Sequence, residues 1–122
     1  MKRKYPRVKV SVSAELRCPT ESFPRRAHTV DLGLGGCYFE MLATLEARSQ
    51  MEVILWIDGE KVRAWAEVVG EHPHVGNCIM FTRMSEDNRV KLKAFIERVQ
   101  ENTGLLRPKQ PVSGPSNPQK SE

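Results

Sequence analysis

The sequence predicts a mainly β domain, an antiparallel barrel or sandwich of six short strands followed by one α-helix. Three observations support this fold class. Several short segments alternate apolar and polar residues, which is the period of a strand with one buried face. Residues that favour turns separate these segments, above all Asp58-Gly59, a strong hairpin pattern. A later segment instead repeats its apolar residues at helical spacing.

The strands are predicted from the alternation itself. In the first of them, every second residue from Val8 to Leu16 is apolar. Pro19 and Pro24 mark the loop that follows, and the glycine-rich residues 31–35 predict a turn between two short strands. We therefore expect strands at residues 8–16, 27–30, 36–41, 51–57, 62–68 and 76–83.

Trp56 and Trp65 fall out of phase with the apolar residues on the two arms of the Asp58-Gly59 hairpin. Aromatic residues that face outward in this way can form a cross-strand staple or a surface for a partner. The sequence favours a staple, or packing beneath the helix.

The helix is predicted to begin after Ser85, a good N-cap residue, and to end at Gly104. Its apolar stripe consists of Leu92, Phe95, Ile96 and Val99. Beyond Gly104 the composition changes to prolines among small polar residues, which bury too little apolar surface to offset the entropy of ordering. We therefore expect a folded domain over residues 1–104 and a disordered, proline-rich tail over residues 105–122.

Length and composition indicate one small domain in a reducing compartment. The 122 residues fit a single domain, and 39% hydrophobic residues suffice for a compact core. Three widely spaced cysteines argue against a disulfide framework. No apolar run resembles a membrane span or the core of a secretion signal. We expect a cytoplasmic protein that does not span a membrane.

Basic residues are concentrated at the N-terminal end of the chain. The net charge is +4, and the residues that precede the first acidic residue, Glu15, include Lys2, Arg3, Lys4, Arg7 and Lys9. Such an end attracts phosphates or nucleic acid, although the charge count alone favours a solvated terminus.

Two short motifs describe a pocket for an anionic guanine nucleotide. Arg3 and Arg7 lie four residues apart just before the first strand. A guanidinium group forks two hydrogen bonds to guanine O6 and N7 and also binds phosphate. Asp31, in the glycine-rich turn, can accept from the guanine N1–H and N2–H₂ donors. The glycines there would let the backbone approach a ligand closely.

The two motifs, R-x-x-x-R over residues 3–7 and D-x-G-x-x-G over residues 31–36, resemble those of the PilZ domain, a bacterial receptor for cyclic di-GMP. Residues 36–39 resemble the family's next strand, and residues 76–81 and 85–87 resemble its last strand and the start of its helix. The resemblance covers roughly residues 2–100 and implies a six-stranded antiparallel β-barrel with a C-terminal α-helix. Gly33 stands where the family usually has serine, so one hydroxyl contact is missing.

The resemblance also implies a ligand site and a mode of action. The N-terminal arm that carries Arg3 and Arg7 would be mobile without ligand and would wrap the nucleotide, with both arginines contacting guanine and phosphate. Asp31 would accept from the guanine edge. The expected ligand-binding residues are Lys2, Arg3, Arg7, Asp31, Gly33 and Gly36. The chain would be a cyclic di-GMP receptor without a cofactor, and not an enzyme. Ordering of its arm would signal to an unknown downstream protein. It would act as a monomer or a weak dimer.

Two other functions stay open. Gly33 is compatible with a PilZ-like adaptor that has lost nucleotide binding and acts through protein contacts. The basic end and the outward tryptophans would also serve a small barrel that binds single-stranded nucleic acid. The basic residues cluster at one end and no nucleic-acid motif is present, so nucleic acid is not the expected partner.

Other chemistry is not favoured by the sequence. His72-Pro73-His74 and Cys78 lack the second ligand pair of a zinc site, so a polar turn is expected there and no metal. No Ser-His-Asp or Cys-His pattern and no G-x-x-x-x-G-K-[S/T] phosphate loop is present.

Overall fold

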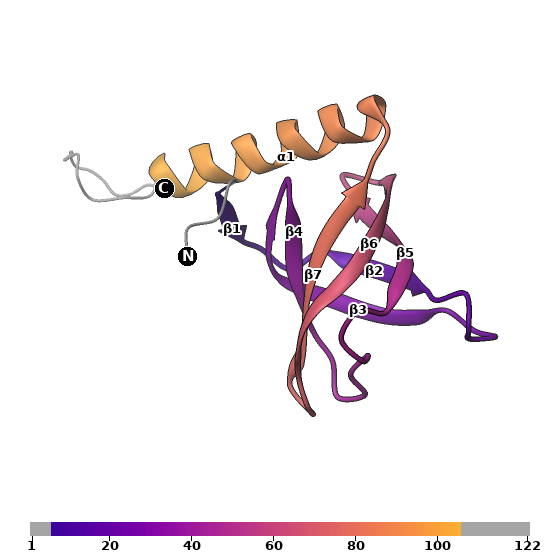
Figure 1. The fold of residues 1–122 in the computed structure, drawn as a ribbon. Coiled ribbons are helices and arrows are strands. Elements are labelled where there is room, and N and C mark those ends of the chain that lie inside the picture. The colour runs from indigo at the N-terminus through magenta and orange to yellow at the C-terminus, as the bar shows by residue number, and fades with distance from the viewer. Residues whose placement is uncertain (1–5, 106–122) are drawn as a thin grey trace.

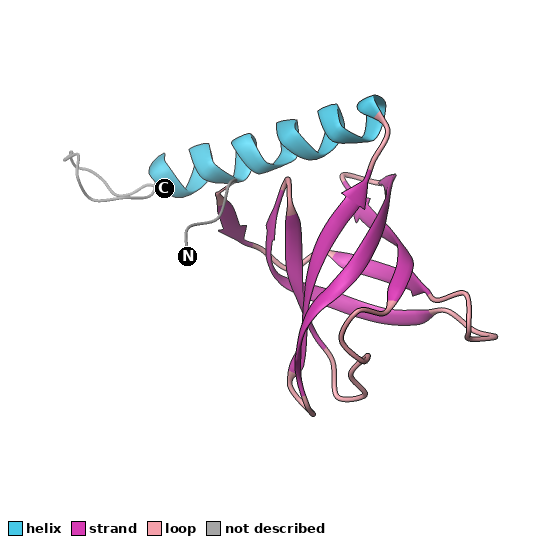
Figure 2. Cartoon of the chain, viewed as in Figure 1, coloured by secondary structure: helices cyan, strands magenta, loops and turns pink. Residues whose placement is uncertain are grey.

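The structure is a computed structural model that describes residues 6–105 of the chain. Within these residues a twisted β-barrel carries a long helix across one end (Figures 1 and 2). In chain order the elements are β1 (Arg7–Lys9), β2 (Ser13–Arg17), β3 (Arg25–Gly33), β4 (Gly36–Glu40), β5 (Gln50–Ile57), β6 (Glu60–His72), β7 (Gly76–Arg83) and α1 (Glu86–Leu105).

The sheet is antiparallel and closes on itself. Neighbouring strands follow the order β3-β2-β5-β6-β7-β4, and β4 pairs again with β3. This closure confirms the predicted six-stranded barrel with a C-terminal helix. The inward residues of the alternation fill the barrel, and the completely buried ones include Leu16, Leu32, Phe39, Val53, Leu55 and Ile79. Each such side chain contributes about 1.5–3 kcal/mol on burial.

The predicted hairpin at Asp58-Gly59 joins β5 to β6. Both residues have positive φ, 53° and 79°, as a tight two-residue turn requires. The strand register corrects the expectation of a tryptophan staple. Trp56 lies opposite Lys61, whereas Trp65 lies opposite Glu52 on one side and Arg83 on the other, so the two indoles are not cross-strand partners.

The predicted first strand consists of two pieces, β1 and β2, that both pair with β3. Between them, the buried Thr29 supplies hydrogen bonds from its side chain. Its hydroxyl donates to the Val10 carbonyl (2.6 Å) and accepts from the Val12 N–H (2.9 Å). Because these two hydrogen bonds leave neither backbone group unpaired, β1 continues along β3 and places Arg7 opposite Gly33.

Strand β3 is longer than predicted. We expected a strand over residues 27–30 and a turn over 31–35, but β3 continues to Gly33 because β1 pairs with one side of it and β4 with the other. The register shifts between Thr29 and Asp31, as at a β-bulge. Asp31 and Gly33 therefore lie on a strand, and the turn is reduced to Leu34 and Gly35.

Helix α1 begins where the sequence predicts. The backbone N–H of Asn88 donates to Ser85 Oγ at 3.2 Å, which confirms the N-cap. The helix continues through Gly104 to Leu105, so the predicted end at Gly104 was short by one residue, within the usual variation of helix boundaries.

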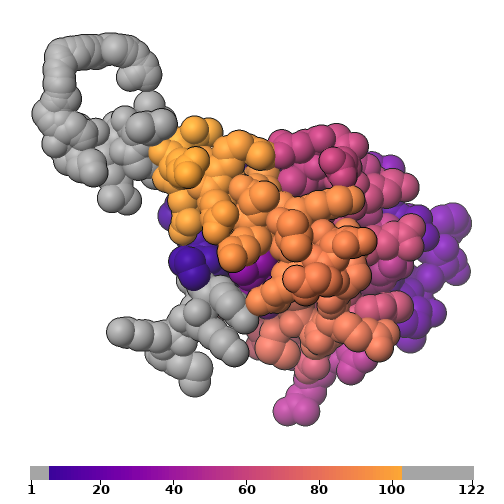
Figure 3. All heavy atoms as spheres, turned by 90° about the horizontal axis from the view of Figure 1, so that it is seen from above, coloured from indigo at the N-terminus to yellow at the C-terminus, as the bar shows by residue number. Residues whose placement is uncertain are grey.

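The same helix covers one end of the barrel (Figure 3). Leu92 and Ile96 are buried against the core, as the apolar stripe predicts. Ion pairs join its outer side to the β5–β6 hairpin: Lys91 Nζ lies 2.9 Å from Glu60 Oε1, and Arg98 pairs with Asp58. In residues 6–105 no helix has the length and apolar character needed to cross a membrane.

Candidate ligand-binding site

Four of the six predicted site residues meet where β1, β3 and β4 run side by side. Arg7 Nη1 donates to Asp31 Oδ1 at 3.0 Å, and the two side chains are only 12% and 20% exposed. Solvent screens such a pair less than a pair on the open surface. A guanidinium has five N–H donors and a carboxylate has two acceptor oxygens, so this single bond uses part of the capacity of each group.

Gly33 and Gly36 complete the cluster with Arg7 and Asp31, because neither glycine carries a side chain that would collide with its neighbours. A Cβ on Gly33 would lie 2.7 Å from the Pro6 carbonyl oxygen and 2.9 Å from Arg7 Cγ. A Cβ on Gly36 would overlap the Ile79 carbonyl oxygen of β7 and lie 3.2 Å from Arg7 Nη2. Neither glycine has positive φ. Both are therefore required by close approach and not by backbone conformation.

Two residues outside the predicted site set flank Asp31 in register. Lys9 lies opposite it on β1, and Tyr38 lies opposite it on β4. The Tyr38 hydroxyl is 3.0 Å from His72 Nδ1 on β6, so this side chain is held in place. The available clue was the alternation of β4, in which Cys37 and Phe39 point inward and Tyr38 between them points outward.

Cys37 lies in the core close to the charged pair. It is completely buried, and burial raises the pKa of its thiol far above the usual range; the positive charge of Arg7 acts against this rise, and Asp31 adds to it. The thiol therefore stays protonated at neutral pH, which is the state of an inert core cysteine.

The described chain begins beside both the cluster and the helix. Pro6 and Leu34 line a small groove of about 170 Å³ with Lys93, Ile96 and Glu97 of α1. Lys2 and Arg3, the other two predicted site residues, precede Pro6 and lie outside the described residues, as does most of the predicted tail. Within the described part, no three His, Cys, Asp or Glu side chains are grouped so as to hold a metal ion.

Comparison with known proteins gives one family and a group of similar folds. The family model of the PilZ domain matches residues 1–98. No curated protein shows a significant match to the chain.

Three solved structures illustrate the likeness of the fold. The PilZ domain of CeSA from a cellulose-synthesizing bacterium is 18% identical with a TM-score of 0.63, covering 78% of this chain and 98% of that one. The PilZ domain of YcgR from Escherichia coli, solved with c-di-GMP, is 13% identical with a TM-score of 0.68, covering 84% and 95%. The Bacillus subtilis inhibitor of motility MotI/DgrA is also 13% identical with a TM-score of 0.68, covering 84% of this chain but 52% of that one.

Proposed function

We propose, from the premise that this chain belongs to the PilZ domain family, that it is a receptor for cyclic di-GMP and acts on a partner protein without catalysing a reaction. Related folds solved with c-di-GMP, such as the PilZ domain of YcgR, support the class of ligand. The proposal for this chain depends on its own residues.

The pair formed by Arg7 and Asp31 carries the proposal. A guanine base presents the O6 and N7 acceptors beside the N1–H and N2–H₂ donors. A guanidinium and a carboxylate held 3.0 Å apart offer the complementary set, donors beside acceptors. Adenine lacks the O6 acceptor and the two donors, so this pair favours guanine.

We propose that Lys2 and Arg3 add the phosphate and second guanine contacts by closing over the bound nucleotide. Arg7, which was expected to move with the arm, instead belongs to β1 and pairs with Asp31. We therefore assign the movement to the residues before it. The closing segment therefore ends at Pro6, which lies against both Gly33 and helix α1. A change in its position would be transmitted to that end of the barrel, where a partner protein would detect it.

One observation favours the second candidate, an adaptor that no longer binds nucleotide. The space beside residue 33, where the family usually carries a serine side chain, is occupied here by the Pro6 carbonyl and the Arg7 side chain. The Arg7–Asp31 pair would then be a purely structural ion pair. The receptor remains the better supported function, since one neutral hydrogen bond contributes only about 0.5–1.5 kcal/mol.

Calorimetric titration of the purified chain separates the two candidates. We expect saturable binding of cyclic di-GMP and far weaker binding of cyclic di-AMP, because unpaired polar groups in a binding site discriminate strongly. If neither nucleotide binds, the receptor is excluded and the adaptor is the supported function. Equal binding of both, or competition by a single-stranded oligonucleotide, would show that the site recognises phosphate charge and not guanine.

A further inference from the structure

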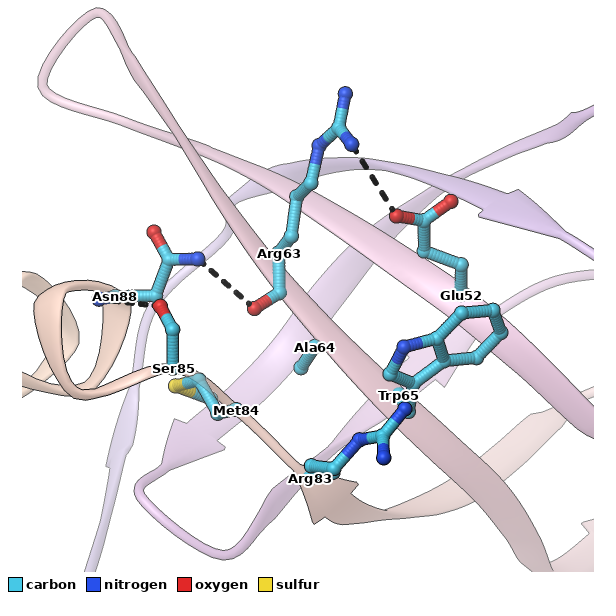
Figure 4. Close-up of a pocket in the computed structure, with 8 residues that line it drawn as sticks. All are labelled: Glu52, Arg63, Ala64, Trp65, Arg83, Met84, Ser85 and Asn88. Atoms are coloured by element: carbon cyan, nitrogen blue, oxygen red, sulfur yellow. Dashed lines mark hydrogen bonds and ion pairs between the residues drawn. The ribbon is translucent and has the colours of Figure 1, made fainter.

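A second surface of the molecule uses none of the residues of the proposed nucleotide site. It is a groove of about 600 Å³ between β6, β7 and the start of α1, which we call the β6–β7 groove (Figure 4). Its lining includes Glu52, Arg63, Trp65, Arg83, Met84 and Asn88. These residues come from three adjacent strands, the segment after β7 and the first turn of the helix.

The groove carries an excess of positive charge. Arg63 Nη1 lies 3.6 Å from Glu52 Oε2, and the Arg63 side chain remains 58% exposed. Arg83 is exposed and forms no ion pair with any other residue in the described range. Glu52 thus balances one of the two guanidinium groups, and the charge of the other is available to an anion.

An apolar surface lies beside that charge. Trp65 is 45% exposed although it stands in the middle of β6, and it is the cross-strand neighbour of Arg83. Met84, half-buried, continues this surface toward the helix. In Figure 4 the Trp65 ring and the Arg83 guanidinium lie at the same end of the groove. Tryptophan and arginine are both among the residue types enriched at the energetic centres of protein interfaces.

The walls of the groove are fixed before anything binds. Asn88 Nδ2 donates to the Arg63 carbonyl at 3.3 Å, and its backbone N–H donates to Ser85 Oγ. The first bond holds the first turn of α1 against β6, and the second caps that turn. A preformed surface loses less conformational entropy on binding than a mobile one.

We propose that the β6–β7 groove binds an extended, acidic segment of a partner protein. A carboxylate of this segment pairs with Arg83, and an apolar side chain two residues away covers Trp65 and Met84. Three adjacent strands span about 10 Å, which is the length of roughly three residues of extended chain. Residues two apart in such a chain point to the same side, so one short segment reaches both features.

The test uses the full chain and a defined peptide, acetyl-Ser-Glu-Ser-Leu-Ser-Glu-Ser-Leu-Ser-amide, whose Glu and Leu side chains share one face when it is extended. In ¹⁵N-labelled protein we expect saturable shifts at the Trp65 indole N–H, at Arg83 and at the backbone of residues 63–65. A peptide with Lys in place of Glu should leave these resonances unchanged.

Charge variants then assign the contact. Arg83→Glu should weaken peptide binding at least about fivefold, since a favourable exposed pair becomes a repulsive one. Arg26→Glu is the matched control: Arg26 is likewise exposed on a strand, β3, outside the groove. An equal effect of both variants, shifts outside the groove, or no shift at millimolar peptide would overturn the proposal, as would saturation of the groove by cyclic di-GMP. Nucleotide binding is measured separately, so this inference and the proposed function can fail independently.

Discussion

The Pro6 carbonyl lies against Gly33, 2.7 Å from the position that a Cβ on residue 33 would take. The chain thus enters β1 through space that any other residue at position 33 would occupy. The contact explains why glycine stands here, where serine is usual in the family: the Pro6 backbone packs directly on the strand at residue 33.

Gly33→Ser tests how the contact between Pro6 and Gly33 affects the stability of the protein and its affinity for the nucleotide. Because Gly33 has no positive φ, serine brings no backbone strain, but its Cβ must displace Pro6 or the Arg7 stem. We expect a loss of unfolding free energy of about 1–3 kcal/mol, typical of overpacking. The measurement is chemical denaturation together with calorimetric titration of cyclic di-GMP.

Gly33→Ala is the matched control, since it adds the same Cβ without a hydroxyl. If the hydroxyl reaches the nucleotide, the serine variant should bind more tightly than the alanine variant, by about 0.5–1.5 kcal/mol. Identical affinities of the two variants would mean that serine has no hydrogen-bond target in this site.

Much of the barrel could be predicted from the sequence, because closure gives each strand one inner face and one outer face. Val8 on β1, and Ala14 and Leu16 on β2, lie on strands as the alternation predicts, and Ser85 caps the helix. The break between β1 and β2 could not be predicted. It depends on the hydroxyl of Thr29, a residue on another strand whose position is known only once the register is set.

The site could be predicted only in part. The motifs named Arg7 and Asp31, but not that they pair with each other across 24 positions of sequence. They also placed Asp31 in a turn, because the glycines around it favour turns locally. The flanking strands β1 and β4 override that preference by supplying partners for the backbone groups of β3.

Thr29→Val should destabilise the protein without changing its shape. Valine has nearly the volume of threonine, but it leaves the Val12 N–H and the Val10 carbonyl without their partner. A buried unpaired polar group costs about 1–3 kcal/mol, which thermal or chemical denaturation will measure. Thr29→Ser, which keeps the hydroxyl, should retain most of the wild-type unfolding free energy. A loss of stability in Thr29→Ser with none in Thr29→Val would point to packing of the methyl group instead.

Stability at acidic pH should depend on Glu21. Its carboxylate accepts hydrogen bonds from Arg25, which lower the pKa of Glu21 below the usual value. Arg25 also donates to the Ala43 carbonyl at 2.7 Å, so the pair joins the β2–β3 loop to the β4–β5 loop. The unfolded chain binds the proton more readily than the folded one, so stability rises with pH across this window.

The stabilisation from Glu21 is therefore complete above the ordinary glutamate pKa and is lost as the pH falls through the lowered one. Wild type should exceed Glu21→Gln in unfolding free energy at neutral pH, and the two curves should converge in acid. Denaturation at a series of pH values provides the comparison. A difference that does not vary with pH would show that the carboxylate charge plays no part.

Arg7→Lys separates the charge of this residue from the shape of its head group. Lysine can still pair with Asp31, so the unfolding free energy should change by about 1 kcal/mol or less. It cannot form the planar fork that guanine O6 and N7 require, so cyclic di-GMP binding should weaken by about 1.5–3 kcal/mol, the usual size of a hydrogen bond to a charged group. Arg26→Lys, at an exposed position of β3, should change neither quantity. Titration and denaturation of the same samples decide the question. Unchanged affinity with reduced stability would make Arg7 a structural partner of Asp31 and would favour the adaptor over the receptor.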